Sequence, residues 1–339
     1  MATRRKATRV AVDAMGGDHA PAEIVAGAVQ AARRDGVQVM LVGDQDRVQP
    51  ELVKHDTRDL LVDTIPSEGV ILEGEPPALA LRQKPKASIM VASRMVKNGH
   101  ADACVTMGST GAAMAAAALV LGVIEGIERP ALGGPIIGIA PHTVIIDLGT
   151  NVDCRPAQLL NFAVIGDVFA RLWWSIERPR VGILNVGAEA GKGTRLVREA
   201  SELLGKSGLN FIGNLEANDL PQNKAEVVVC DGFVGNIVMK LTEGLGLALS
   251  DHLRSRLEGK LPAPALDEVV GEVYELNNPA EILGGGPLFG VNGVSVVGHG
   301  RARAAAVERA IGTAKLAVES RLVANINEEL ARMRAKVVA

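Results

Sequence analysis

The chain has 339 residues, of which 47% are hydrophobic, and its 36 Lys and Arg against 39 Asp and Glu give a formal net charge of -3. This near-neutral balance and an aromatic content of 2% argue against nucleic-acid binding through a basic field or base stacking, so we expect no nucleic-acid partner. The apolar content is ample for the core of one large or two ordinary α/β domains.

Strand and helix patterns alternate along nearly the whole chain. Helical patterns separate most of the expected strands, which lie near residues 9–13, 38–42, 60–64, 102–106, 143–148, 181–185, 210–213 and 226–230. This alternation is typical of βαβ units and a mainly parallel sheet. The apolar runs at 37–42 and 227–230 fit strands covered on both faces, so the sequence predicts an α/β fold with helices on both sides of the sheet.

The first strand runs directly into a glycine turn that carries polar groups. Asp13 stands at the end of the strand, Gly16 and Gly17 permit positive φ angles, and Pro21 opens an amphipathic helical stretch. Ligands of open α/β sheets bind at such strand ends, although Asp18 in the same turn is open to a simpler interpretation as a helix cap.

The same pattern of strand, glycine turn and helix recurs at four further places, which are residues 105–111, 145–151, 183–187 and 227–232. Each turn presents backbone N–H groups, and most lead to a helix start that favours an anion. The sequence therefore predicts a phosphate or carboxylate site assembled from distant loops.

Several catalytic motifs are absent. No GxGxxG follows the first strand and no GxSxG occurs, which argues against a dinucleotide dehydrogenase and a serine hydrolase. The stretch 187–194 resembles a Walker A loop, but three residues instead of four separate Gly187 from Gly191, and Gly193 stands where magnesium needs a hydroxyl. Lys192 remains a candidate phosphate or transition-state ligand, with Thr194 as a helix cap.

Three further segments carry expectations. The Ala-rich run 112–124 is too short to span a bilayer and predicts a buried helix. Prolines and glycines make 64–86 and 261–287 candidates for flexible lids. Leucines recur every four residues from Leu241 to Leu261, which fits a core or dimer helix or a peripheral membrane dock.

Cysteine and histidine positions are uninformative for metal or disulfide chemistry. Cys104, Cys154 and Cys230 are odd in number and widely spaced, which fits a reducing compartment and core thiols. The six histidines form no HxH or HxxxH pair, so no metal is predicted. Met1–Arg9 is basic, but the following apolar run is broken by Asp13 and the glycines, so we expect no signal peptide and a cytoplasmic location.

Several motifs together resemble the bacterial phosphate acyltransferases of phospholipid synthesis. They are residues 12–21 (VDAMGGDHAP), 147–156 (DLGTNVDCRP), 189–193 (EAGKG), 210–214 (NFIGN), 229–236 (VCDGFVGN), 284–293 and 298–300. The resemblance covers about residues 8–316. It departs from the family pattern at Ser109, where Asn is usual, and at Thr150, where Ala is usual.

The resemblance implies a three-layer α/β/α sandwich like that of the phosphate acetyltransferase and isocitrate dehydrogenase class, in a homodimer. It also implies transfer of a fatty acyl group from acyl carrier protein to inorganic phosphate, with no cofactor. We expect residues 8–325 to form a single catalytic domain. A helical insertion at about 236–283 is expected to contact a partner subunit, the carrier protein or the membrane.

Site residues follow from the motifs that match. Lys192 and the amides of the glycine loops would stabilise phosphate and the oxyanion, Asn151 and Asn236 would orient substrate, and His19 or His299 would protonate the departing thiolate. Aspartates at strand ends would repel phosphate unless they pair with Lys192, Lys240 or Arg155, so we expect them to have orienting roles. The expected substrate-binding and phosphate-binding residues are Asp13, Gly16, Gly17, Asp18, Ser109, Thr110, Gly111, Asn151, Gly191, Gly193, Asp231, Gly232 and Lys240.

Two basic segments are expected to contact partners. The acidic carrier protein or a membrane surface would contact residues of the proline-rich segment and of the leucine stripe, namely Arg82, Lys84, Lys86, Leu253, Arg254, Arg256, Leu257 and Lys260. Because the family hands its product to a membrane glycerol-phosphate acyltransferase, we expect peripheral association with the inner face of the cell membrane. The open alternatives are a short-chain phosphate acetyltransferase or butyryltransferase that uses coenzyme A thioesters, and a catalytically silent lipid-regulatory scaffold.

Overall fold

The computed structural model describes residues 7–338, which divide into two compact units. The first unit holds residues up to 125 together with 283–324, and the second holds 126–282 with the end of the chain from 325. The prediction of a single catalytic domain over 8–325 stays a prediction, as does the contact role of the helical segment 236–283.

The first unit contains a six-stranded sheet. Its strand order is β3-β2-β1-β4-β11-β10, parallel throughout except that β10 is antiparallel to β11. The strands are β1 (Arg9–Asp13), β2 (Gln38–Gly43), β3 (Val62–Pro66), β4 (Ala103–Thr106), β10 (Gly286–Phe289) and β11 (Val294–Val297). The chain proceeds outward from β1 to β3 and returns on the other side of β1 at β4, so the carboxyl ends of β1 and β4 flank a topological switch point.

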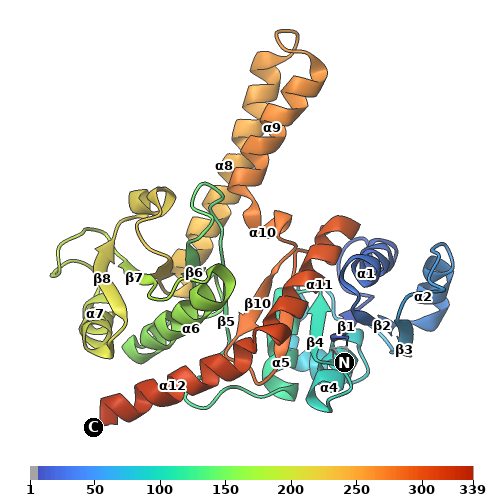
Figure 1. Ribbon diagram of the computed structural model, residues 1–339, viewed down its shortest axis with the longest axis horizontal. Helices are drawn as coiled ribbons and strands as arrows, with labels where there is room; N and C mark the ends of the chain where they lie inside the picture. Colours follow the sequence, from blue (N-terminus) through green and yellow to red (C-terminus); the bar gives the residue numbers. More distant parts are fainter. Residues whose placement is uncertain (1–6, 339) are drawn as a thin grey trace, which may run out of the picture. The chain divides into compact units, whose positions relative to one another are not determined.

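Helices cover both faces of this sheet. On one side α1 and α11 pack against each other and against β1, and on the other α4 packs against β1, β2 and β4 and against α5 (Figure 1). Every residue of β4 is buried, as expected for a strand covered twice. The helices of this unit are α1 (Ala22–Asp35), α2 (Gln45–Leu52), α3 (Pro77–Gln83), α4 (Ser88–Lys97), α5 (Thr110–Val120), α11 (Ala304–Glu319) and the start of α12 (Leu322–Val338).

The second unit has five strands in the order β5-β6-β9-β7-β8, parallel except for the antiparallel pair of β5 and β6. The strands are β5 (Ala131–Gly134), β6 (Val144–Ile146), β7 (Arg180–Leu184), β8 (Asn210–Leu215) and β9 (Val227–Val229). The helices are α6 (Pro156–Trp174), α7 (Arg195–Ser207), the 3-10 helix η1 (Ala217–Gln222), α8 (Gly232–Leu257), α9 (Ala263–Asn277) and α10 (Pro279–Ile282).

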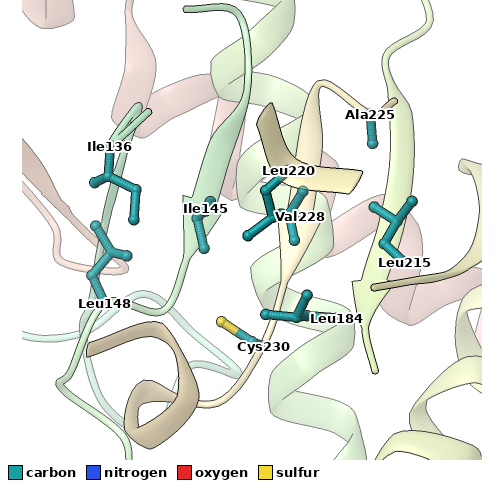
Figure 2. Packing of buried hydrophobic residues seen from close by; sticks show 9 residues of the cluster. All are labelled: Ile136, Ile145, Leu148, Leu184, Leu215, Leu220, Ala225, Val228 and Cys230. Atoms are coloured by element: carbon teal, nitrogen blue, oxygen red, sulfur yellow. The ribbon is translucent and has the colours of Figure 1, made fainter. Parts of the chain in front are cut away.

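The core of the second unit lies between these strands and the first turns of α8. Figure 2 shows Ile145, Leu184, Leu215 and Val228 of the strands side by side, with Leu220 of η1 over them. Val234, Val238 and Met239 of α8 pack against the same cluster, whereas α6 packs against β6 and β9. Each unit therefore has helical layers around a mainly parallel sheet, which confirms the predicted α/β fold class.

Helices α8 and α9 pack against each other as a hairpin that extends beyond the strands of the second unit (Figure 1). A line of large apolar side chains on α8 is 46% to 60% exposed, and we call it the α8 stripe: Phe233, Ile237, Leu241, Leu245 and Leu249. The stripe begins earlier than the leucine pattern predicted, and α8 ends at Leu257, before Leu261. No helix within residues 7–338 is both long and apolar enough to cross a bilayer.

All eight predicted strands are present close to their expected positions, but β5, β10 and β11 were missed. The run 112–124 was predicted as a buried helix, and α5 instead buries one face and leaves Leu119 64% exposed. The candidate lid 261–287 consists mainly of α9 and α10, and 64–86 contains α3.

Candidate active site

In the first unit, Asp13 joins the ends of two strands. Asp13 is the last residue of β1, is 3% exposed, and accepts a hydrogen bond of 2.7 Å at Oδ2 from Thr106 Oγ1 at the end of β4. The backbone N–H of Met15 donates to its other oxygen at 3.2 Å. Burial raises the pKa of the Asp13 carboxyl, and the hydrogen bond from Thr106 acts in the opposite direction.

Two glycine loops meet at this carboxylate. Gly108 N donates to Thr106 Oγ1 at 3.0 Å. A Cβ atom on Gly16 would stand 2.7 Å from Asp13 Oδ2 and 2.8 Å from Gly108 N, so a side chain has no room there. Gly17 has φ of +100°, which favours glycine. The structure thus places Gly16 and Gly17 beside the Gly108 turn, as the recurrence of the pattern predicted.

The turn leads into α5. Ser109 is the N-cap residue, but its side chain makes no capping hydrogen bond, and Thr110 and Gly111 form the first turn. The first N–H groups of a helix have no partner inside the helix, so this end presents donors to an anion. Pro77 at the start of α3 lies against Gly111, where a Cβ atom would be 3.1 Å from its Cγ.

Asp18 and the two candidate histidines lie on neighbouring segments of the same unit. The N–H of Asp18 donates to Gly300 O at 2.7 Å, which brings the turn carrying His19 beside the loop carrying His299. Asp18 is not the cap of α1, because the N-cap residue is Pro21 and no side chain caps that helix. The structure therefore contradicts the interpretation of Asp18 as a helix cap.

In the second unit, Asp147 follows β6 and is fully buried. Its oxygens accept hydrogen bonds from Leu132 N at 3.1 Å, Thr150 Oγ1 at 2.6 Å, and both the N–H (2.7 Å) and Nδ2 (2.9 Å) of Asn151. All these donors are neutral. The expectation that strand-end aspartates pair with a cation is wrong for Asp13 and Asp147, because hydroxyl and amide donors satisfy them, and Arg155 pairs with Glu128 instead.

Asn151 and Asn236 flank a glycine beside the start of α8. Asn151 is 2% exposed, and its Oδ1 has no hydrogen-bond partner among the residues that the structure describes. A Cβ atom on Gly149 would lie 3.3 Å from Asn236 Oδ1. Gly232 N donates to Asn151 O at 2.7 Å, so the two asparagines come from segments in direct contact.

Two further residues expected at the binding site are Asp231, which directly precedes α8, and Lys240, which lies within α8. Asp231 is the N-cap, and its Oδ1 accepts from Val234 N at 2.9 Å, which is a structural role in starting the helix. Lys240 is exposed and lies about one helical turn beyond Asn236.

The loop of Lys192 is fixed by two asparagines that sequence reasoning did not single out. Asn185 Nδ2 donates to Lys192 O at 3.1 Å, and Asn214 Nδ2 donates to Glu189 O at 2.8 Å. Thr194 caps α7 as predicted, accepting from Val197 N. Lys192 and Gly191 are exposed, whereas Gly193 is half-buried with φ of +91° against Asn185.

These loops share one edge of the second unit. Asp147 follows β6, Asp231 follows β9 and Asn185 follows β7, and these three strands are adjacent and parallel. At about 4.8 Å between neighbouring strands, the ends of β6 and β7 stand ~10 Å apart. A thioester and a phosphate fit a site of this span. A polar residue at or directly after the end of an apolar strand is the signal that finds Thr106, the last residue of β4, and Asn185, which follows β7, whereas Asn214 lies within β8.

The residues assigned to partner contacts are on the surface, but several are already paired. Lys84 Nζ contacts both carboxylate oxygens of Glu75 at 2.7 Å, and Lys86 pairs with Glu68 at 2.8 Å. Arg82 is exposed. On the hairpin, Arg254 pairs with Asp267 at 2.7 Å, while the remaining members, Leu253, Arg256, Leu257 and Lys260, stand near the end of α8 and in the connection that follows it.

Known proteins resemble this chain in sequence and in fold. A family model described as "Fatty acid synthesis protein" matches residues 8–325. The phosphate acyltransferase of Desulforamulus reducens is 42% identical over 95% of this chain and 97% of its own length, and that of Moorella thermoacetica is 44% identical over 94% and 95%.

Among solved structures, a phosphotransacetylase from Streptococcus pyogenes matches with a TM-score of 0.59 at 20% identity, covering 93% of this chain and 95% of that one. At this identity the match shows the fold alone, which is the class of fold expected from the sequence. The sequence relatives, in contrast, match over nearly the whole of both chains. The chain belongs to the phosphate acyltransferase family and is an acyltransferase.

Proposed function

We propose that this enzyme transfers a long-chain fatty acyl group from acyl carrier protein to inorganic phosphate, and that the acyl phosphate enters phospholipid synthesis. The observation that carries the proposal is the chemistry of the strand ends, which offer amide and backbone donors and one lysine. The cysteines are no alternative as nucleophiles, because all three are buried.

The proposed reaction needs no covalent intermediate. A phosphate oxygen attacks the thioester carbonyl carbon and forms a C–O bond, the carbonyl becomes an oxyanion, and the C–S bond then breaks. The carrier thiolate takes up a proton, from His19 or His299 in our assignment, and acyl phosphate is released. A thiol of pKa about 8.5 is a good leaving group, so the main barrier is electrostatic.

The donors of the strand-end cluster in the second unit match that barrier. A dianion must approach a carbonyl that is itself becoming negative, so donors fixed in advance lower the barrier more than mobile ones. The Oδ1 of buried Asn151, which is unpaired among the residues that the structure describes, is left to accept a donor such as a protonated phosphate oxygen. Asn236, which lies beside Gly149, would supply a hydrogen-bond donor, and Lys192 would supply a positive charge, to the phosphate or the oxyanion.

The donor and the reaction are tested together. Purified protein is incubated with palmitoyl-acyl carrier protein with and without phosphate, and acyl phosphate is trapped as a hydroxamate, with palmitoyl-coenzyme A and acetyl-coenzyme A in parallel. Phosphate-dependent product from the carrier-protein donor supports the proposal. Product only from coenzyme A donors would favour the short-chain transferase, and binding of the carrier without turnover would favour a silent scaffold.

Lys192→Ala tests the assigned cation in the same assay. We expect turnover to fall by at least about 100-fold, because the removed charge stabilises the transition state in preference to the ground state. Lys206→Ala at the other end of α7, which is also exposed, is the matched control and should retain activity. Near-normal turnover of the Lys192 variant would remove this residue from the mechanism.

The assembly and location proposed for the enzyme follow from its surface. The exposed α8 stripe supports a homodimer or a contact with the inner face of the cell membrane, where the product passes to a membrane glycerol-phosphate acyltransferase. Flotation with anionic vesicles tests the membrane contact, and failure to float together with them would count against it.

A further inference from the structure

The loop of Lys192 and the first turn of α7 carry a basic patch that lies outside the residues assigned to carrier contact. Arg195, the first residue of α7, is 86% exposed, and Lys192 and Arg198 are also exposed. Residues three apart on a helix are neighbours, so Arg195 and Arg198 lie together. Arg198 Nη1 donates to Gly193 O at 2.6 Å, which places it over the loop beside Lys192. We call Arg195 and Arg198, which lie beside Lys192, the α7 patch.

The positive potential of this patch is only partly offset by its surroundings. The first turn of α7 has no acidic residue, and its N-cap is the uncharged Thr194, so the helix dipole adds to the three cations. Arg195 lies 3.6 Å from Glu199, an exposed pair that solvent screens strongly. Glu189 is in the same loop, and its Oε2 and the Lys192 side chain both lie beside Gly187, so this carboxylate offsets part of the charge of the lysine.

The patch has an apolar neighbour. Val186 is 81% exposed, and its N–H donates to Asn185 Oδ1 at 2.8 Å, while the Nδ2 of the same asparagine holds Lys192 O. One side chain therefore fixes both the valine and the lysine. Exposed cations beside an exposed valine complement a protein surface that carries carboxylates around an apolar residue. A small anion could pair with the cations but would leave the valine uncovered.

We infer that the α7 patch is the docking surface for the acidic surface of the acyl carrier protein. The inference rests on the proposed function, since it takes the carrier as the acyl donor. The patch follows β7, at the same edge of the second unit as the Asp147, Asn151 and Asn236 cluster, so a carrier docked there presents its thioester arm toward that cluster. Of the carrier-contact candidates in the proline-rich segment, Lys84 is held by Glu75 in a half-buried pair, whereas the pair of Lys86 with Glu68 is exposed and screened like that of Arg195 with Glu199.

Charge reversal at the patch tests the inference while leaving Lys192 in place. We expect Arg195→Glu/Arg198→Glu to weaken binding of fluorescently labelled acyl carrier protein about 10-fold and to raise KM for palmitoyl-acyl carrier protein similarly, and we expect Arg195→Glu alone to leave kcat within about twofold. Binding to the wild type should weaken as salt is raised, and binding to the variant should depend less on salt. Arg195→Glu alone preserves the bond from Arg198 to Gly193 and should show a smaller loss in the same direction.

Two control variants make the result specific. Arg178→Glu changes an exposed arginine directly before β7, at the opposite edge of the same sheet, and should bind normally. Arg256→Glu/Lys260→Glu tests the competing site on the hairpin. Normal binding by the α7 variants, or a loss confined to the hairpin variant, would overturn the inference.

The remaining outcomes separate this inference from the proposed function. Carrier binding that depends on the patch, without phosphate-dependent turnover by the wild type, would reject the function and keep the docking surface. Binding to vesicles containing phosphatidylglycerol is measured for the same variants. If the α7 variants lose binding to these vesicles but not to the carrier protein, the inference is overturned, because the surface would then recognise lipid.

Discussion

Asp13 and Asp147 have the same task in the two units. Each follows a buried parallel strand, and each accepts a hydrogen bond from a threonine hydroxyl, from Thr106 and Thr150 respectively. Their negative charges are enclosed by backbone N–H and hydroxyl donors, so they order the loops without presenting a bare carboxylate to phosphate. This arrangement explains how acidic residues can stand at the proposed phosphate site.

Asp147→Asn should destabilise the enzyme by about 2–4 kcal/mol, because an amide group cannot accept from all the donors that converge on the carboxylate, and buried donors without partners are costly. Urea unfolding monitored by circular dichroism measures the change. Asp153→Asn, at an exposed position in the same loop, is the control and should change stability little. Equal stability of the two variants would mean that the Asp147 network contributes nothing to folding.

The three thiols should be unreactive in the native enzyme. Burial raises the pKa of Cys104 to about 11 and that of Cys154 to about 12, and it also raises the pKa of Cys230. The thiolate is the reactive form, so at pH 8 the native protein should react with a thiol reagent far more slowly than the unfolded chain. Rapid labelling of one thiol in the native state, located by mass spectrometry, would contradict this and reopen a role for cysteine.

Sequence reasoning named candidate site residues but not their contacts. A carboxylate at the end of an apolar strand is visible in the sequence, which is why Asp13 was singled out, whereas Asn151 and Asn236 were singled out through the motifs that resemble the family. Their partners are not visible, because Thr106 lies 93 positions from Asp13 and is brought to it only by the pairing of β1 with β4. The expected cation partners were wrong because neutral donors close in the fold already satisfy these acids.

At the scale of elements, close helix packing depends on glycines that have no other signal in the sequence. Gly27 of α1 faces α11, where an added Cβ atom would overlap Ala304 O and lie 2.6 Å from Val307 Cβ. Gly205 of α7 has nothing within 4 Å of such an atom. Two helical glycines with similar local sequence preferences thus have opposite structural environments.

Gly27→Ala should lower the free energy of unfolding by about 1–2 kcal/mol, since overpacking outweighs the better helix propensity of alanine. Gly205→Ala should raise it by about 0.5–1 kcal/mol, because only the propensity term remains. Thermal and urea unfolding of both variants test the pair. Stabilisation by Gly27→Ala would show that α1 and α11 separate at little cost.

The three strands that sequence reasoning missed are short, and two of them, β5 and β10, contain residues that ordinarily break strands, whereas the valine-rich β11 does not. Ala131–Gly134 ends in two glycines and Gly286–Phe289 contains glycine and proline, so neither resembles a strand locally. Both are antiparallel to a neighbour, and pairing compensates for poor intrinsic preference. The prolines at 262, 264 and 279 suggested a lid, but they lie at or near the starts of α9 and α10, where proline is well tolerated.

At the scale of the whole molecule, the enzyme combines buried strand-end sites with an exposed apolar helix. The strand-end sites need little more than the two sheets, whereas the α8 stripe has no role within the second unit. Burying a large apolar side chain is worth about 1.5–3 kcal/mol, so five exposed ones at four-residue spacing strongly favour association. The basic α7 patch follows β7 instead, so carrier docking and association through the stripe use different surfaces of this unit.

We expect the enzyme to sediment at twice the 35.4 kDa of one chain, because a second copy can cover the α8 stripe with its own stripe in a symmetric contact. Leu241→Lys/Leu245→Lys should shift it to the monomer, since two charges at the centre of an apolar contact cannot be solvated there. Leu247→Lys changes a leucine of α8 that is 43% exposed but lies outside the stripe, and it should leave the dimer intact. Sedimentation velocity over a range of concentrations measures all three proteins. A wild-type monomer whose binding to anionic vesicles is abolished by Leu241→Lys/Leu245→Lys would instead assign the stripe to the membrane, because lipid would then be its only partner.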